Sequence, residues 1–338
     1  MATRLRVIDA GFLGAVRSQA LWHGLAEAMA PSDDPVLSFC RPSEPYVGIG
    51  FHRRLDELDG AACQRLGLPV LRRQIGGGPV YLDQDQLFFQ VTLPVKMVPP
   101  GVSRLYGELL GPAVSALRSR GVHASLAGTN DIVAGGRKVS GTGAGQIGEG
   151  VVLVGNVLFG FDYERMSEVL RFPDDAMRAD FLRLLRDNLG TLPDLDATAL
   201  KHGLVDAYAT ALCRRPVYDG LRPRELAAVE RWDSRLTDPQ WRDGPVLAPA
   251  AGWQVKVRAG TWLYDGGSGG LRVRVRVQDG QITQARVTAP WLNGSATPLA
   301  QALVGVAARA DRVAASLDRF EHDGELVLKA LAPGLVVR

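Results

Sequence analysis

The sequence is poor in the residues that mark disulfide-stabilised and metal-binding proteins. Its 338 residues include three cysteines, Cys40, Cys63 and Cys213, which are far apart and form no CxxC pair. This pattern predicts neither a disulfide framework nor a cysteine-based metal site, and it favours a reducing compartment such as the cytoplasm. The five histidines are scattered along the chain, and none is expected to act as a catalytic base.

Long hydrophobic runs are missing as well. The longest apolar stretch, residues 151–161, is interrupted by Asn156 and is too short to cross a bilayer. Near the first residue, Asp9 breaks the apolar part and a strand-then-helix pattern follows directly, so we expect no signal peptide. The sequence therefore predicts no membrane association.

A strong charge imbalance is absent too. The net charge is +3 and the sequence pI is 8.8, which is too little to indicate nucleic-acid binding without a concentrated basic patch. Hydrophobic residues make up 46% of the chain and charged residues 22%, as expected for a folded globular protein with a real core. We expect a monomer that binds no nucleic acid.

The length favours two domains, because 338 residues exceed what most single cores use. Hydrophobic periodicity predicts a mixed α+β domain with a mainly antiparallel sheet over residues 1–240, a Pro/Gly/Ala-rich linker at 241–252, and a small α+β domain at 253–338. In the first domain we expect strands at residues 5–11, 35–42, 46–51, 69–75, 79–83, 86–94, 131–141 and 150–161, and helices at 15–29, 54–67, 103–121 and over most of 163–231. In the second we expect strands within 253–289 and one helix at 297–317.

The stretch Arg72-Arg73-Gln74-Ile75-Gly76-Gly77-Gly78-Pro79 is the first candidate for a binding site. It is no P-loop, because no Lys-Ser/Thr pair follows, and no dinucleotide fingerprint, because Gly78 leads into a strand. Glycine lets backbone approach a ligand closely, and the paired arginines could supply donors to an anion. A glycine-rich hairpin with solvated arginines is the alternative.

The second candidate is the stretch Asn130 to Gly143, in which Gly135-Gly136 predicts a two-residue hairpin turn. That turn pairs Val133 with Lys138 and Asp131 with Ser140. Asp131, Lys138 and Ser140 then share one face, while Ile132 and Val139 share the other. The face is either a lysine held over a bound carboxylate or phosphate, or an ordinary surface ion pair that contributes less than about 1 kcal/mol.

Together, "RRQIGGGPVYLD" and "NDIVAGGRKVSGTG" resemble the lipoate-protein ligase family of the biotin/lipoate ligase superfamily. Its members usually show an arginine-rich strand, a Gly-Gly-Gly-Ala-Val-aromatic turn and, later, an Asn-Asp strand that leads to Arg-Lys-Ile/Val-Ser-Gly. The helix "GFLGAVRSQALWHGLAEA", the segment "YVGIGFHR" and "NLGTLPDLDATALKHGLVDAYATAL" follow in the family's order, and the resemblance extends over nearly the whole chain. It implies the biotin/lipoate ligase-like fold and a fused C-terminal accessory domain.

The resemblance also implies an activity: ATP-dependent conversion of lipoate or octanoate to the acyl-adenylate, then transfer to a lysine of a lipoyl carrier domain. Matching positions make Lys138 the catalytic residue, in contact with both the acyl carboxyl and the adenylate phosphate. Lipoate would lie against Lys138, Gly77, Ser140 and Gly141, and Mg²⁺ is expected on the phosphates. The nucleotide would be bound by Arg73, Gly76, Gly77, Gly78, Pro79, Val80, Tyr81, Asp83, Asn130, Asp131 and Lys138.

The chain departs from the family pattern at three places. Pro79 stands where alanine is usual and removes a backbone N–H from the loop. Gln86 stands where asparagine is expected. The segment "VVLVGNVLF", with Gly155 and Asn156, occupies the region where many members carry His-His-Gly or His-Gly.

Two alternatives to the ligase stay open. An octanoyl-carrier-dependent octanoyltransferase would have the same fold but needs a cysteine near the lysine, and residues 139–212 contain none. A lipoyl or nucleotide sensor would bind without turnover. Separately, Arg272, Arg274 and Arg276 alternate with valines, which predicts a solvated outer face, or else a docking face for an acidic carrier domain.

Overall fold

The chain forms two compact units in the computed structural model, which describes residues 4–245, 252–292 and 296–335. The first unit holds residues 4–171 and 186–245, and the second holds residues 172–185, 252–292 and 296–335. The expected α+β class with mainly antiparallel sheets is confirmed. Half of the expected linker, residues 246–251, lies outside the described residues. Residues 172–185, which the sequence-based division placed in the first domain, pack with the second unit.

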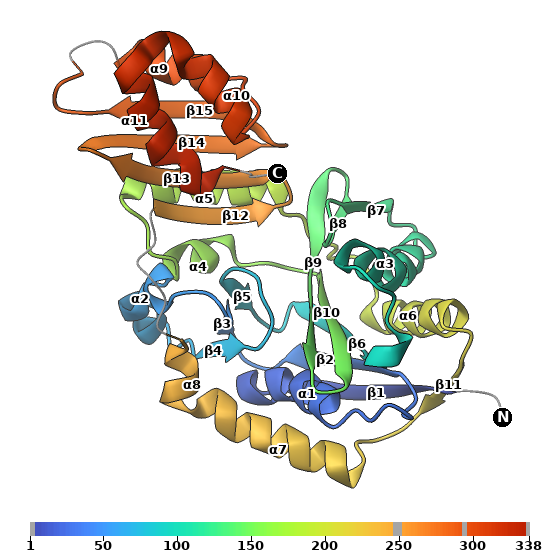
Figure 1. The fold of residues 1–338 in the computed structure, drawn as a ribbon. Helices are drawn as coiled ribbons and strands as arrows, with labels where there is room; N and C mark the ends of the chain where they lie inside the picture. The colour runs from blue at the N-terminus through green and yellow to red at the C-terminus, as the bar shows by residue number, and fades with distance from the viewer. Residues whose placement is uncertain (1–3, 246–251, 293–295, 336–338) are drawn as a thin grey trace. The chain divides into compact units, whose positions relative to one another are not determined.

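An eight-stranded sheet organises the first unit (Figure 1). The strand order is β11 (Arg215–Tyr218), β1 (Arg4–Leu13), β2 (Val36–Pro42), β6 (Gln86–Pro94), β10 (Gly150–Leu158), β9 (Arg137–Ile147), β8 (Asp131–Ala134) and β7 (Ala124–Ala127). β1 pairs in parallel with β2 and with β11, and the other neighbours run antiparallel. Strands β7 and β11 at the two edges were not expected from the sequence.

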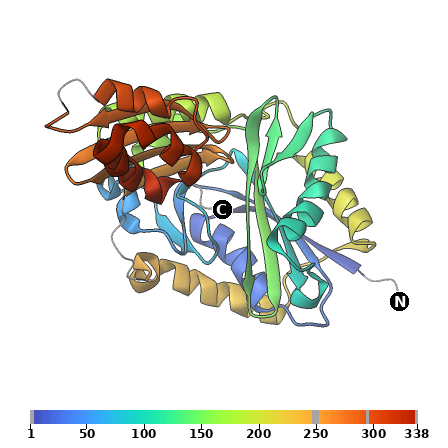
Figure 2. The same cartoon turned by 45° about the horizontal axis from the view of Figure 1, so that its top comes forward.

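Helices cover both faces of this sheet. Figure 2 shows β9 and β10 standing between α1 (Ala15–Glu27) and α3 (Val102–Arg118). α7 (Pro223–Thr237) packs so closely on α1 that a Cβ built on Gly24 would lie 2.5 Å from the Val229 nitrogen, so only glycine fits there. Since apolar residues of α1 and α7 join Ile147 and Val152 in one buried cluster, these helices fix the sheet face that carries β9 and β10.

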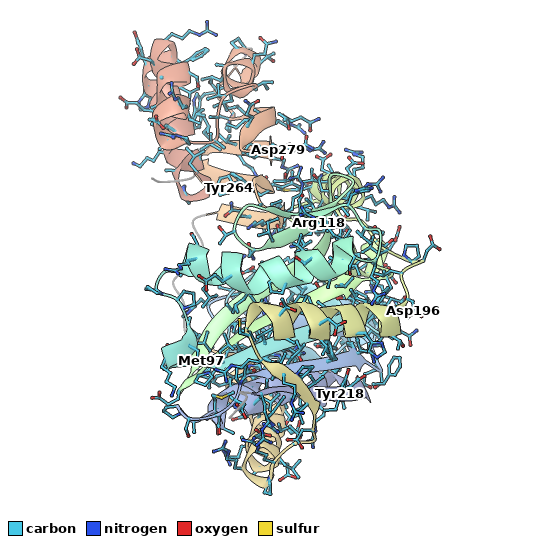
Figure 3. The ribbon with its side chains drawn as sticks, turned by 90° about the vertical axis from the view of Figure 1, so that its right-hand side faces the viewer. Met97, Arg118, Asp196, Tyr218, Tyr264 and Asp279 are labelled. Atoms are coloured by element: carbon cyan, nitrogen blue, oxygen red, sulfur yellow. The ribbon has the colours of Figure 1, made fainter. Side chains whose placement is uncertain are left out.

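On the opposite face, α3 and α6 (Ala197–Ala211) run side by side. Figure 3 looks onto them, with Arg118 at the end of α3 and Asp196 at the start of α6. Asp196 caps α6 by accepting a hydrogen bond from the Ala199 N–H. The buried Tyr208 hydroxyl donates to the Leu109 carbonyl over 2.7 Å, so the two helices are joined by a bond as well as by apolar packing.

A three-stranded sheet, β4-β3-β5, carries the glycine-rich stretch. β3 (Tyr46–Gly50) pairs in parallel with β4 (Val70–Arg73) and antiparallel with β5 (Val80–Leu82). The loop of residues 74–79 therefore joins two strands that flank the same central strand. The helix expected at 54–67 is only a 3₁₀ turn, η1 (Leu55–Glu57), and a short α2 (Gly60–Arg65), because Asp59 caps a new helix by accepting from the Ala62 N–H.

The long helical region is more broken than expected. Residues 163–243 hold α4 (Tyr163–Glu168), α5 (Asp175–Asn188), α6, β11, α7 and α8 (Pro239–Asp243). In the second unit, the helix expected at 297–317 divides at Gly305, whose φ of +82° is incompatible with a helix. None of the helices within the described ranges is long and apolar enough to cross a membrane.

The second unit has its own core between a four-stranded sheet and three helices. The other face of the sheet is lined by the arginine row that was expected to be solvated. Instead, Arg274 is paired with Asp265 and Asp174, and Arg276 with Asp180 at 3.3 Å, so this prediction is wrong for two of the three arginines. The elements are β12 (Gly252–Arg258), β13 (Thr261–Ser268), β14 (Leu271–Gln278), β15 (Gln281–Thr288), α9 (Ala296–Leu303), α10 (Ala310–Leu317) and α11 (Glu321–Leu331).

Candidate active site

The loop between β4 and β5 exposes its three glycines, Gly76, Gly77 and Gly78. Gly77 has a φ of +103°, and a Cβ there would lie 2.7 Å from Arg73 Nη2, so the loop needs glycine at this position. Arg73 closes the loop by hydrogen bonding, because its Nη2 donates to the Gly78 carbonyl at 2.7 Å and to the Gly76 carbonyl at 3.2 Å. Gly76 and Gly78 themselves face open space.

Arg73 combines burial with an unused donor. Only 8% of the residue is exposed, and its Nη1 has no hydrogen-bond partner among the described residues. Burial lowers the pKa of the guanidinium to about 10, so it stays charged at neutral pH. A phosphate or carboxylate oxygen is a suitable partner for this group, because it would accept the unused N–H and neutralise the buried charge.

His23 on α1 supports the loop from the other side. Its Nε2 accepts the Gln74 N–H at 3.0 Å, so its Nδ1 carries the hydrogen and donates to the Gln19 carbonyl at 2.7 Å. The ring is stacked between Trp22 and Trp232. Burial lowers the pKa of His23 to about 3, so the imidazole is neutral and serves as a fixed acceptor, consistent with the expectation that it is no catalytic base.

The hairpin that carries Lys138 forms as predicted at its turn. Gly135 and Gly136 have φ values of +56° and +76°, the conformation that a two-residue turn of this kind requires. Val133 lies opposite Lys138, and the Lys138 ammonium reaches Asp131 at 2.7 Å. Asp131 is buried whereas the Lys138 side chain is 18% exposed, so the ammonium lies between a buried carboxylate and the surface.

The expected pairing fails one residue further along. The register shifts between Ile132 and Val133, which places Ser140 opposite Ile132 and Gly141 opposite Asp131. A β-bulge explains the shift, because one extra residue in β9 changes which side chains share a face. Ser140 is completely buried and its hydroxyl finds no partner in the part of the chain that the structure describes. Gly141, and not Ser140, therefore lies beside the Lys138 ammonium.

The two glycine-rich segments lie against each other through Ile75. Cβ atoms built on Gly143 and Gly145 of β9 would lie 3.0 and 2.7 Å from the Ile75 side chain. Ile75 therefore packs against β9 only because both of these positions are glycine. Ile75 is buried and directly precedes the exposed glycines. The structure thus brings together the loop with Arg73 and the strand with Lys138, which are far apart in the sequence.

The remaining expected nucleotide residues lie near these segments in different ways. Pro79 and Val80 are half-buried, and Tyr81 is buried with its hydroxyl 3.3 Å from Arg165 Nη1. Burial raises the pKa of the Asp83 carboxyl, whose Oδ1 accepts from the Asp85 N–H and from Gln86 Nε2.

Asn130 is hydrogen-bonded within the hairpin. Its Nδ2 donates to the Thr142 carbonyl, and the Thr142 hydroxyl donates to the Asn130 carbonyl. These bonds hold the start of β8 on β9, which is a structural task.

Arg72 does not have the role expected for it, which was to bind an anion together with Arg73. Its guanidinium donates to the carbonyls of Gly50, Phe51 and Arg53 and to those of Arg242 and Asp243. All its donors serve backbone, so Arg72 joins α8 to the small sheet and Arg73 alone faces the loop.

Residues that the sequence reasoning did not assign complete the surroundings of Lys138. The Gly190 N–H donates to the Lys138 carbonyl at 2.8 Å, and the Tyr163 hydroxyl donates to the Leu189 carbonyl at 3.1 Å. Asn156 and Gln86 form a hydrogen-bonded bridge from Gly141 to Tyr81. Their only signal in the sequence was that both stand where the family pattern breaks.

Within the described ranges, no three His, Cys, Asp or Glu side chains converge as a metal site, so we assign no residue of this chain as an Mg²⁺ ligand. A hollow of about 670 Å³ is lined by residues of α3 and α6 together with Ser119 and Arg120, and by none of the site residues. The hollow is therefore separate from the candidate site.

The fold is that of the lipoate ligases. A bi-partite lipoate protein ligase from Thermoplasma acidophilum superposes with a TM-score of 0.66 at 21% identity, over 74% of this chain and 99% of that one. A lipoate-protein ligase A bound with ATP gives a TM-score of 0.61 at 21% identity, over 72% of this chain and 99% of that one. At this identity the likeness establishes the fold alone.

Sequence comparison gives the family. Residues 16–206 match the family described as "Lipoyl protein ligase A/B catalytic domain". This match covers more than half of the chain and both segments with the candidate site, so the protein belongs to that family.

Individual relatives carry two different names. A lipoate–protein ligase of Streptococcus pyogenes is 27% identical over 213 residues, which are 62% of this chain and 59% of the relative. An octanoyltransferase LipM of Symbiobacterium thermophilum is 26% identical over 219 residues, which are 57% of this chain and 79% of the relative. The chain thus spans somewhat more than half the length of the streptococcal ligase, and relatives of both kinds are about equally similar.

Proposed function

We propose that the protein is an ATP-dependent lipoate-protein ligase. It converts lipoate or octanoate to the acyl-adenylate and then transfers the acyl group to a lysine of a lipoyl carrier domain. The observation that carries the proposal is the position of the Lys138 ammonium, which is paired with Asp131 at 2.7 Å and lies next to Gly141, where no side chain intervenes. The strand that holds it packs against the loop closed by Arg73.

In the first step the acyl carboxylate attacks the α-phosphorus of ATP, an acyl–phosphate bond forms and pyrophosphate leaves. Two anions must meet, so a fixed ammonium between them lowers the barrier. This role is supported by the Asp131 carboxylate, which holds the Lys138 ammonium before any substrate binds. Arg73 Nη1 and the exposed glycine backbone are suited to hold the phosphate end of the nucleotide.

In the second step the acceptor amine attacks the acyl carbon, an amide forms and AMP leaves. No nucleophile of the enzyme is required. The acceptor must be neutral when it attacks, and Lys138 stabilises the departing AMP by staying charged. The acceptor we propose is a lipoyl domain, the partner named for the Thermoplasma ligase.

The cysteines favour the ligase over a transferase with a thioester intermediate. Cys40 on β2 is 1% exposed, and burial raises the pKa of its thiol to about 12, so a thiolate is strongly disfavoured. Cys63 on α2 is buried as well. Cys213 is exposed but precedes β11, five strand spacings from β9, which is roughly 24 Å at the usual spacing.

The test is the intact mass of a lipoyl domain incubated with the protein under two conditions. One reaction contains ATP, Mg²⁺ and free lipoate or octanoate, and the other contains octanoyl carrier protein without ATP. We expect the mass to rise only with ATP. Modification without ATP would establish the transferase instead, and nucleotide binding without modification would establish the sensor.

A further inference from the structure

Two amide side chains link the two halves of the candidate site. Asn156 Oδ1 accepts the Gly141 N–H at 2.8 Å, and Asn156 Nδ2 donates to Gln86 Oε1 at 2.7 Å. Gln86 Nε2 then donates to the Tyr81 carbonyl at 3.1 Å and lies 3.4 Å from Asp83 Oδ1. The chain of bonds therefore runs from the strand of Lys138 to the strand that follows the glycine loop.

The direction of every bond in this bridge is fixed by chemistry. The Gly141 N–H can only donate and the Tyr81 carbonyl can only accept, so each amide has one usable orientation. Gln86 is completely buried and Asn156 is half-buried, which makes an unmade bond expensive. The bridge thus specifies the separation of its two ends.

The bridge stands where β9 loses one of its two neighbouring strands, while β8 still pairs with it. The ladder between β9 and β10 ends at the pair Thr142 and Gly155, and β9 continues toward Lys138 without this neighbour. The Asn156 side chain replaces the missing ladder bond by taking the Gly141 N–H. On the β10 side, the first residues of β9, which include Lys138, are therefore held by a side chain instead of a ladder bond.

The bridge also reaches the Lys138 ammonium. A Cβ built on Gly141 would lie 3.3 Å from Lys138 Nζ and 3.6 Å from Asn156 Oδ1, so both groups border the same small space. Gln86 and Asn156 are moreover two of the positions at which the chain departs from the family pattern. Gln86 is one methylene longer than the asparagine expected at its position, and its amide is hydrogen-bonded to the Asn156 amide. The two departures therefore occur at residues that contact each other.

We infer that Asn156 and Gln86 are positioning residues of the acyl-adenylate site, which together set where the Lys138 ammonium stands relative to the glycine loop. The inference rests on the proposed function. Neither residue exchanges a proton or forms a bond with substrate; each acts through the backbone of Gly141 and Tyr81.

The test exploits the combined length of the two amides. Asn156→Gln and Gln86→Asn each change the bridge by one methylene, whereas the double variant exchanges the lengths and keeps their sum. We expect each single variant to lower kcat for pyrophosphate release by about tenfold or more, since misplacement of a fixed group is costly, with KM for ATP changed by less than about threefold. The double variant should recover most of the loss.

Gln90→Asn is the matched control, because Gln90 is another buried amide of β6 whose partners, Ser38 and Cys40, lie away from the bridge. Rates are normalised to the folded fraction obtained from thermal unfolding. Wild-type kcat in both single variants, an equal kcat loss in Gln90→Asn, or no recovery in the double variant would overturn the inference. If the wild-type protein releases no pyrophosphate at all, the proposed function fails instead.

Discussion

Lys138 has two tasks that substitutions can separate. Its ammonium neutralises the buried Asp131 carboxylate, and in the proposed reaction it also lies between the acyl carboxylate and the α-phosphate. The first task concerns stability and the second concerns the transition state. A variant that relieves the buried charge without restoring the ammonium distinguishes them.

We expect Lys138→Ala to abolish acyl-adenylate formation, measured as pyrophosphate release, and to destabilise the fold by up to about 3 kcal/mol because a buried carboxylate loses its cation. Lys138→Ala combined with Asp131→Asn should recover stability but no activity. Lys201→Ala is the control, since Lys201 pairs with Asp9 elsewhere on the surface and should matter little. Near-normal pyrophosphate release by Lys138→Ala would refute the assignment.

The glycines of the loop differ from one another, although the sequence shows three identical residues. Only Gly77 combines a φ of +103° with a neighbour, Arg73 Nη2, at 2.7 Å from a built Cβ. Gly76 and Gly78 would meet nothing within 4 Å.

We therefore expect Gly77→Ala to destabilise the protein by about 1–2 kcal/mol and to weaken ATP binding, because the left-handed backbone and the Arg73 contact are both disturbed. Gly76→Ala and Gly78→Ala should stay within about 0.5 kcal/mol of wild type. Thermal unfolding with and without ATP measures both effects, since a ligand that binds the folded state raises Tm. Equal losses at all three positions would show that the distinction is wrong.

At the scale of the element, the glycine loop depends on α1. The neutral His23 ring accepts the Gln74 N–H and is packed between two tryptophans, with Arg73 and Arg235 as the charges that act on it. Protonation would remove this acceptor and bury a cation beside two others. The loop and α1 are therefore expected to lose stability together in acid.

The pH window follows from the two pKa values. An unfolded histidine titrates near 6.5 whereas His23 in the fold titrates at about 3, so the unfolded state binds the extra proton between these values. The free energy of unfolding should fall by about 1.4 kcal/mol per pH unit below pH 6 from this group alone. Denaturant titrations should show a shallower decline for His23→Gln, while His52→Gln, at an exposed histidine, should keep the wild-type slope. Parallel slopes for all three proteins would exclude this role of His23.

At the scale of the whole molecule, the second unit is not a simple C-terminal module. Residues 172–185 lie in the sequence between two segments of the first unit, but they pack in the second unit. Met177, Phe181 and Leu184 are buried, and the Phe172 ring contacts the Trp253 ring. The Arg274 guanidinium holds the pKa of the Asp174 carboxyl below its usual range. Arg274 and Arg276 are used in these pairs and Arg272 also contacts Asp265, so carboxylates of the same unit neutralise much of the arginine row.

We expect truncation after residue 246 to expose the apolar side of α5, because its partners are removed. The truncated protein should bind a hydrophobic dye and unfold at lower temperature than the full chain. Replacing Met177 and Phe181 by serine in the truncated protein should reduce dye binding. A truncated protein that is as stable as the full chain and binds no dye would show that α5 needs no partner.

Much of the fold and of the site could be read from local patterns. Alternation and turn glycines place the hairpin with its turn at Gly135 and Gly136, and they bring Lys138 onto the face of Asp131. Short-range signals also locate most strands of the first unit. The roles of the site residues in catalysis stay predictions that the proposed experiments address.

The sequence by itself determined the α+β class, the glycine loop and the strand with Lys138, because turn preference and side-chain alternation depend on near neighbours. Only the tertiary structure decided that a bulge moves Ser140 into the core, that Arg72 serves backbone carbonyls, and that Asn156 and Gln86 bridge the two motifs. It also decided that residues 172–185 join the second unit. Each of these depends on the competition of distant groups for the same hydrogen bonds, charges and buried surface, which no local pattern records.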